Sequence, residues 1–255
     1  MNDQVKDAPP PHAVARLRAA CLADSGTRPR LDRGEPRKDR CAGCRLVPSH
    51  CMCALRVSVP TRAGVCLVMG ELEALKPSNT GWLVADVVPD THAFAWSRTH
   101  VDPALSALLD DPRWHPVVVF PGEFAAPERV IAELPPAAAS RRPLFILLDG
   151  TWAEARKAFR KSPALDRFPV LGLRPEQSSR YKLRRAWHEH HLCTAEVAAL
   201  CLAIAGDPHA AQALEATLDV FSDRYLRARQ SVPPDAGDEI HRRLAALGRP
   251  TTQGA

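Results

Sequence analysis

The sequence predicts an α/β fold whose core is a mostly parallel sheet. Short apolar runs alternate along the chain with amphipathic stretches of helical length, which is the rhythm of strand–helix–strand units. One apolar run also ends in Asp149-Gly150, immediately before a predicted helix, and ligands of open α/β sheets bind beyond such strand ends. The last third of the chain is predicted to be helical. The expected architecture is therefore a sheet core followed by a helical C-terminal part.

The strand candidates are five short apolar runs between residues 63 and 173. Val, Leu, Ile and Phe dominate them, as is typical of strands. In order along the chain they are Val65–Met69, Ala93–Trp96, Val117–Phe120, Leu144–Leu148 and Val170–Leu173.

Helices are predicted between these strands and again after them. Thr151 and Glu154 have the T-x-x-E spacing of a capping box, so one helix is expected to begin at Thr151 and to cover Ala153–Lys161. Thr194–Ala205 opens with a cap and an early glutamate, and Gly206 closes it. The remaining predicted helices are Thr80–Val88, Pro103–Leu109 and Ala210–Gln230.

Composition divides the chain into four segments. Residues 1–38 are rich in Pro, Arg and Asp without apolar periodicity, which predicts a disordered basic arm. Residues 39–58 carry a cluster of cysteines, and residues 59–231 hold the predicted strands and helices. Residues 232–255, which begin beside a Pro-Pro pair, are expected to form a flexible tail.

Composition also narrows the class of protein. Charged residues make up 25% and hydrophobic residues 45%, which is ordinary for a globular protein. No apolar run approaches the roughly 18–20 residues of a membrane span. The polar segment Met1–Pro11 lacks the apolar region of a signal peptide. We therefore expect a cytoplasmic protein without a membrane partner, in which thiols stay reduced.

The net charge of +5 is modest but unevenly distributed. Clusters of Arg and Lys are typical of surfaces that bind a polyanion, although a charged surface that serves only solubility gives the same pattern. The two clusters are Arg16, Arg18, Arg28, Arg30, Arg33, Arg37, Lys38 and Arg40, and then Arg174, Arg180, Lys182, Arg184 and Arg185.

Four thiols within 13 residues form the pattern Cys41-x2-Cys44-x6-Cys51-x-Cys53. A CxxC turn directs two sulfurs at one point, and the nearby CxC completes a tetrahedral site. Soft ligands in a reducing compartment favour structural zinc, and a closed four-cysteine site leaves no position for a substrate. An iron–sulfur cluster, redox-active thiols, or a site in which His50 replaces one cysteine are the alternatives.

The strand end at Asp149 is the main candidate for chemistry. Its carboxylate is expected just outside a helix N-terminus, beside backbone N–H groups that lack an intrahelical partner. Trp152, in the first turn of that helix, is large enough to wall a pocket. The plainer interpretation is a solvated aspartate in a strand–helix turn, with Trp152 packed between helix and sheet.

Five motifs in order resemble the DTW-domain family, over about Arg40–Arg229. The resemblance is greatest to the bacterial tRNA-uridine aminocarboxypropyltransferases of that family. The motifs are the cysteine cluster, Lys76-Pro77-Ser78-Asn79-Thr80-Gly81, Asp149-x-Thr151-Trp152, Tyr181-x-Leu183-Arg184 and Cys193-Thr194-Ala195-Glu196.

This resemblance implies an enzyme with S-adenosylmethionine as its donor substrate and tRNA as its partner. The 3-amino-3-carboxypropyl group would be transferred to N3 of a uridine in the tRNA variable loop, position 47 in bacteria (acp3U47), with release of methylthioadenosine. It also implies a SPOUT-like core, with residues 59–231 as the DTW catalytic domain and residues 39–58 as its zinc knuckle.

Site residues follow from the matched motifs together with the chemistry. Asp149 would accept the N3 proton or orient the uracil edge, and Trp152 would stack on the extruded uracil or on the adenine of the donor. Helix capping is the alternative role for the donor-site residues, and a solvated basic loop is the alternative for the RNA contacts. The candidates are Asp149, Thr151 and Trp152 for catalysis; Asn79, Thr80, Gly150, Thr194 and Glu196 for the donor; Tyr181, Lys182, Arg184 and Arg185 for RNA; and Cys41, Cys44, Cys51 and Cys53 for the metal.

One departure from the family pattern is clear. Many members carry a His-Pro pair three residues before the glutamate that corresponds to Glu73, whereas this chain has Gly70-Glu71. Two other functions compete with aminocarboxypropyl transfer: a SPOUT-type S-adenosylmethionine-dependent RNA methyltransferase, and a non-catalytic zinc-knuckle RNA-binding protein. The oligomeric state is left open by the sequence.

Overall fold

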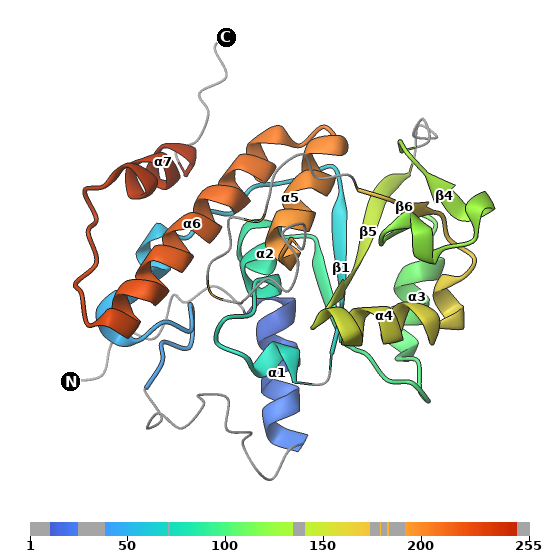
Figure 1. The fold of residues 1–255 in the computed structure, drawn as a ribbon, viewed down its shortest axis with the longest axis horizontal. Coiled ribbons are helices and arrows are strands. Elements are labelled where there is room, and N and C mark those ends of the chain that lie inside the picture. The colour runs from blue at the N-terminus through green and yellow to red at the C-terminus, as the bar shows by residue number, and fades with distance from the viewer. Residues whose placement is uncertain are drawn as a thin grey trace.

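A six-stranded sheet forms the centre of the described part of the chain (Figure 1). The structure, a computed structural model, describes residues 11–24, 39–70, 72–134, 141–173, 179, 183 and 192–248. The strands are β1 (Gly64–Met69), β2 (Thr91–Ala95), β3 (Trp114–Val119), β4 (Val130–Ile131), β5 (Arg142–Asp149) and β6 (Val170–Leu171).

All neighbouring strands run parallel, in the order β2-β1-β5-β3-β6-β4. The predicted α/β class is therefore confirmed, with a sheet that is parallel throughout. The central strands β1 and β5 are buried along most of their length. Burial on both faces explains why they are nearly continuous apolar runs in the sequence.

Alternating side chains of the strands enter two separate cores. Val65, Leu67, Phe145 and Leu147 face one core, whereas their neighbours such as Ile146 face the other. This alternation follows from the two-residue repeat of a strand. It places the side chain of Asp149, which has the parity of Phe145 and Leu147, on the first face.

Seven α-helices in the described residues cover these faces. Residues of α2, α5 and α6 pack in the first core, and residues of α3 and α4 in the second. Figure 1 shows these two groups on opposite sides of the sheet. The helices are α1 (Ala13–Asp24), α2 (Gly81–Val87), α3 (Pro103–Asp110), α4 (Trp152–Arg160), α5 (Thr194–Ile204), α6 (Pro208–Gln230) and α7 (Glu239–Leu247).

Two helices lie where the sequence predicted disorder. Helix α1 lies inside the expected arm, residues 1–38, and its Val14 is fully buried. Helix α7 lies inside the expected tail, residues 232–255, and its Leu244 is fully buried. Prediction failed because each helix is short and flanked by Pro-rich sequence, so that its stability comes from tertiary packing. Among the helices of the described residues, none has the length and apolarity to cross a bilayer.

Candidate active site and cysteine knuckle

The candidate active site lies where the chain leaves β1 and β5 in opposite directions. β1 is followed by α2 and its neighbour β2, whereas β5 is followed by α4 and by β6 on the other side of the sheet. Such a divergence between adjacent parallel strands is where open α/β sheets bind ligands. The N–H of Gly70 donates to the carbonyl of Asp149 at 2.8 Å and holds the two strand ends together.

Asp149 ends β5 with its carboxylate buried and held by two other elements. Thr194 Oγ1, at the start of α5, donates to Oδ1 at 2.6 Å. Asn79 Nδ2, just before α2, donates to Oδ2 at 2.7 Å. The residue is only 3% exposed. The interpretation of Asp149 as a solvated turn residue is therefore wrong, and three motifs far apart in sequence meet at this carboxylate.

Asn79 and Thr80 also bind the first turns of helices α2 and α5. Asn79 Oδ1 accepts from the N–H of Trp82 at 2.9 Å in the first turn of α2, and Thr80 Oγ1 accepts from the N–H of Ala195 at 3.3 Å in the first turn of α5. Both residues are buried. Asn79 thus has the predicted capping role at α2, whereas the side chain of Thr80 makes no cap bond to α2 and instead accepts from α5, more than a hundred residues away in sequence.

Glu73 forms a second buried carboxylate beside Asp149. It is 1% exposed, accepts from Asn79 Nδ2 at 3.3 Å, and is paired with the ammonium group of Lys76. The amide of Asn79 therefore bridges two acids whose charges would otherwise repel each other in a site of low polarity. Glu73 was not among the predicted site residues, because only the tertiary fold brings η3 (Glu73–Leu75) against the end of β5.

Gly81 allows the carboxylate to approach α2 closely. A Cβ atom at this position would lie 2.5 Å from Asp149 Oδ2, well inside van der Waals contact. Any side chain here would displace the carboxylate or the helix, so the close packing of Asp149 requires glycine.

Two glutamates cap the helices that start at the site. Thr151 and Glu154 form the predicted capping box of α4, with Thr151 as its N-cap. Burial opposes ionisation of Glu154, but the hydrogen bonds from Thr151 outweigh it and lower the pKa of the carboxyl. Glu196 likewise accepts from the N–H of Cys193 at 2.7 Å and caps α5.

The ring of Trp152 lies among aromatic side chains of the second core. It stacks on Phe120 with centroids 5.4 Å apart, and contacts Phe124 edge-on at 5.6 Å. It remains 37% exposed, so packing leaves part of the indole open to a ligand. Asp149 is held by Asn79 and Thr194, whereas Trp152 packs on Phe120 and Phe124. The role of Trp152 as the wall of a pocket beside Asp149 stays a prediction.

The four predicted RNA-binding residues lie outside the described residues. They are Tyr181, Lys182, Arg184 and Arg185. Their role stays a prediction. Gly70, one of the two positions where the chain departs from the family pattern, is described: a Cβ there would lie 3.5 Å from the carboxyl carbon of Glu154.

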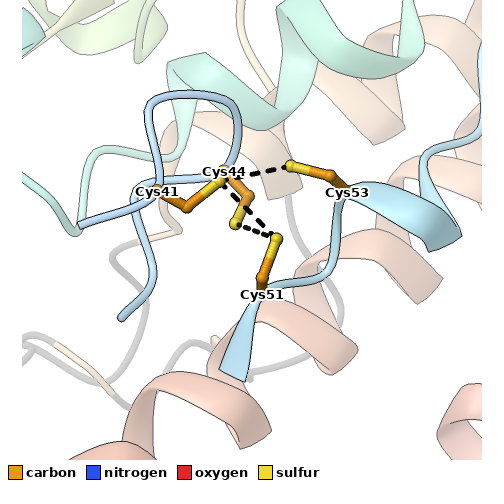
Figure 2. A group of neighbouring side chains, drawn as sticks. All are labelled: Cys41, Cys44, Cys51 and Cys53. Atoms are coloured by element: carbon orange, nitrogen blue, oxygen red, sulfur yellow. Dashed lines mark hydrogen bonds between the residues drawn. The ribbon is translucent and has the colours of Figure 1, made fainter. Parts of the chain in front are cut away.

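The four clustered cysteines converge to form the predicted knuckle (Figure 2). The sulfurs of Cys41 and Cys53, and of Cys41 and Cys51, are 3.5 Å apart, and those of Cys44 and Cys51 are 3.7 Å apart. A tetrahedral zinc site with Zn–S bonds of about 2.3 Å would set the sulfurs about 3.8 Å apart. The cluster can therefore hold a metal ion, and its donor set fits zinc.

Local backbone features make this convergence possible. A Cβ at Gly43 would lie 2.7 Å from Cys53 Sγ, so the CxxC turn requires glycine at this position. Burial opposes ionisation of Cys41, but backbone N–H groups and the neighbouring thiols lower its pKa to about 7. Burial raises the pKa of Cys44 to about 11. A bound cation would favour the thiolate form of all four.

Arg45 connects the knuckle to the candidate active site. It is 3% exposed and has a left-handed backbone with φ of 65°. Its guanidinium donates to the carbonyls of Lys76, Pro77 and Asn79 at 2.9–3.0 Å. It also lies over the ring of Trp82, with 4.4 Å to the centroid. Nothing in the sequence marks this role except the position directly after the CxxC motif.

A conserved-domain match identifies the class of protein that this fold and site define. The sequence profile of the DTW domain matches residues 38–226, so the chain belongs to the DTW-domain family and the knuckle lies inside the family domain. The chain is also similar to tRNA-uridine aminocarboxypropyltransferase 2 of Drosophila melanogaster, with 33% identity over 107 residues. That match covers 42% of this chain and 39% of the relative. No solved structure matches the chain.

Proposed function

We propose that this protein is a tRNA-uridine aminocarboxypropyltransferase. It would transfer the 3-amino-3-carboxypropyl group of S-adenosylmethionine to N3 of a variable-loop uridine, leaving methylthioadenosine. The observation that carries the proposal is the meeting of Asn79, Asp149 and Thr194 at the divergence of β1 and β5. Each of the three residues belongs to a different motif of the family. The similarity to the Drosophila enzyme supports the same chemistry.

The transfer requires the enzyme to orient the donor and the uridine more than to activate the donor. N3 of uridine forms a bond to the Cγ of the methionyl group, the Cγ–S bond breaks, its electron pair stays on sulfur, and the N3 proton leaves to a base. The sulfonium is already reactive, so the enzyme must present Cγ and keep the methyl group away from N3. A rigid set of buried side chains at the strand ends suits that task.

The donor fits the start of α4 and α5, which both begin beside Asp149. The helix N-termini offer backbone N–H groups and positive dipole ends to the carboxylate of the methionyl group. In our proposal Gly150, Thr151 and Glu154 shape the start of α4, while Thr194, Glu196 and the Asn79–Thr80 pair shape the start of α5.

Asp149 has two candidate roles in this scheme, acceptance of the N3 proton and orientation of the uracil edge. Its carboxylate is held by Asn79 and Thr194 on its two oxygens, which favours orientation over proton acceptance. Trp152, with part of its indole exposed, is the candidate platform for an extruded base. The tRNA contacts are proposed for Tyr181, Lys182, Arg184 and Arg185.

For the knuckle we propose structural Zn²⁺ held by Cys41, Cys44, Cys51 and Cys53. Its support is the sulfur separations, which match a tetrahedral S4 set. In this role the metal would fix the turn that presents Arg45 to the residues before α2.

The test incubates purified protein with unmodified tRNA and donor labelled either in the methyl group or in the carboxyl group. Aminocarboxypropyl transfer places the carboxyl label, and not the methyl label, on RNA. Methyl label on RNA would make the protein a methyltransferase instead. If the protein binds tRNA tightly and in a salt-sensitive way but transfers neither label, it is an RNA-binding protein without this activity. Mass analysis of the modified nucleoside identifies the base.

A further inference from the structure

Helix α4 presents a row of exposed cations that starts beside the candidate active site. Arg156, Lys157, Arg160 and Lys161 are exposed, and with Trp152 they line a shallow hollow of about 290 Å³. Trp152, Arg156 and Arg160 follow one another at i, i+4 spacing, so they lie along one side of the helix. Because α4 begins directly after β5, the helix that carries this row leads away from the strand ends (Figure 1).

These cations lack acidic partners within the described part of the chain. Among the described residues, the ion pairs of the structure include none of Arg156, Lys157, Arg160 and Lys161. Other exposed arginines differ: Arg113 pairs with Asp111 at 2.6 Å, and Arg167 pairs with Asp110 at 2.5 Å. A helix face with four uncompensated positive charges is suited to an anionic polymer.

Aromatic side chains interleave with the charges at the end nearest the site. Trp152 and Phe124 are each 37% exposed, and Trp152 stacks on the buried Phe120. The guanidinium of Arg156 lies 5.3 Å from the ring centroid of Phe124, and Lys157 Nζ lies 5.6 Å from that of Trp96. Exposed rings beside cations are typical of surfaces that bind unpaired nucleotides, in which bases stack and phosphates are neutralised.

We infer that the α4 surface, defined as Trp152, Phe124, Arg156, Lys157, Arg160 and Lys161, binds the tRNA backbone next to the modified uridine. The cations hold phosphates on one side of that nucleotide, and the aromatic end lies nearest the reacting base. This inference rests on the proposed function and names how the substrate is held. It adds contact residues to the four proposed above, Tyr181, Lys182, Arg184 and Arg185.

The experiment compares two double variants of the full chain that remove the same charge. Arg156→Gln with Arg160→Gln removes two cations from the α4 surface. Arg113→Gln with Arg167→Gln is the matched control: both residues are exposed and lie before β3 and β6, at the opposite end of the strands from Asp149. Melting temperatures check that both variants fold, and donor binding is measured without RNA.

The α4 double variant should bind tRNA about tenfold more weakly at about 0.1 M salt. The slope of log affinity against log salt should fall by about one unit for each lost phosphate contact, about two in all. Its KM for tRNA should rise while its affinity for the donor stays unchanged. The control should behave as the wild type in all these measurements.

Three results would overturn the inference, and they are distinguishable. If the wild type modifies tRNA and the α4 variant binds tRNA with the affinity and salt slope of the control, the surface assignment alone fails. If the wild type neither binds nor modifies tRNA, the proposed function is wrong, and so is the assignment of tRNA as the ligand of the α4 surface. Competition by polyglutamate as effective as that by tRNA fragments would assign the surface to an acidic protein and also overturn it.

Discussion

The guanidinium of Arg45 donates to the backbone carbonyl of Asn79 at 2.9 Å, and so joins the cysteine knuckle to the residue that holds Asp149. The same side chain satisfies the carbonyls of Lys76 and Pro77 and stacks on Trp82. The segment before α2 is therefore held from the knuckle side by one arginine and from the sheet side by one aspartate.

Replacement of Arg45 by lysine should loosen this segment although the charge is kept. A compact ammonium cannot reproduce the planar fork that reaches three carbonyls. Buried carbonyls left without a donor cost about 1–3 kcal/mol each, so the variant should lose at least about 2 kcal/mol of unfolding free energy. Amide hydrogen exchange should speed up at Asn79. Arg227→Lys, which alters a partly exposed pair with Asp223, is the control and should change neither quantity. Unaltered exchange at Asn79 in Arg45→Lys would show that the arginine does not hold this segment.

Thr194→Val tests the contribution of the Thr194 hydroxyl group without a large change in side-chain shape. The substitution removes the donor to Asp149 Oδ1 and leaves the volume almost unchanged. Hydrogen bonds to a charged group contribute about 1.5–3 kcal/mol, so transfer should slow by roughly 10- to 150-fold if the bond is needed in the transition state. Thr194→Ser keeps the donor and should recover most of the rate. Steady-state kinetics of carboxyl-label transfer measure both, and a valine variant as fast as the serine variant would contradict this role.

Loss of the knuckle thiols should remove a metal ion and lower stability. In Cys41→Ser with Cys44→Ser, only two of the four sulfurs that converge in Figure 2 remain. We expect the metal content to fall from about one ion per chain to none, with a lower melting temperature and weaker tRNA binding, because a structural zinc site contributes directly to folding. Cys21→Ser lies outside the cluster and serves as the control. An unchanged melting temperature and metal content would rule out a structural site.

The pH dependence of stability should report on the docking of α1. Burial, reinforced by Arg56, Arg45 and Arg16, lowers the pKa of His12 from 6.5 to about 3. Between these values the unfolded chain holds a proton that the folded chain lacks, so the contribution of this group to stability falls as the pH falls below 6.5. By pH 5 the loss is roughly 2 kcal/mol.

Asp86 acts in the opposite direction and its Oδ1 lies 3.4 Å from His12 Nε2, so the comparison reports on His12 together with this contact. Burial raises the pKa of Asp86 from 3.8 to about 6, and protonation of the folded state there stabilises it as the pH falls through that range. Urea unfolding of the wild type and of His12→Phe, from pH 7 to pH 4.5, gives a difference curve. The unfolding free energy of His12→Phe should rise relative to that of the wild type as the pH drops below 6.5. A control variant of the exposed His100, His100→Gln, should have the same pH dependence of unfolding free energy as the wild type. Parallel curves for His12→Phe and the wild type would disprove the buried neutral imidazole.

The fold was predictable where burial imposes a local pattern. The central strands β1 and β5 are largely apolar because both of their faces are covered. The start of α4 is predicted by its capping box. Short elements escaped prediction: β4 has two residues, and α1 and α7 are flanked by proline-rich sequence. Their structure depends on the surface against which they pack, and a local window of sequence does not contain it.

The candidate site was predictable as a set of residues but not as an arrangement. Motif order selected Asn79, Asp149 and Thr194, and the structure brings them into contact. Glu73 and Arg45 were not selected, because their roles exist only through partners brought close by folding. The expectation that Trp152 walls a pocket beside Asp149 came from adjacency in sequence, and strand alternation directs Asp149 to the face of α2 and α5.

A Cβ atom at position 81 would lie only 2.5 Å from the carboxylate of Asp149, so the residues at these two positions depend on each other. A chain of this architecture that gains alanine or serine at 81 must give up, shorten or redirect the acid at the end of its central strand. In a related sequence, a glycine at the position of Gly81 is therefore expected to accompany an acid at the position of Asp149, and a larger residue is expected to accompany its loss.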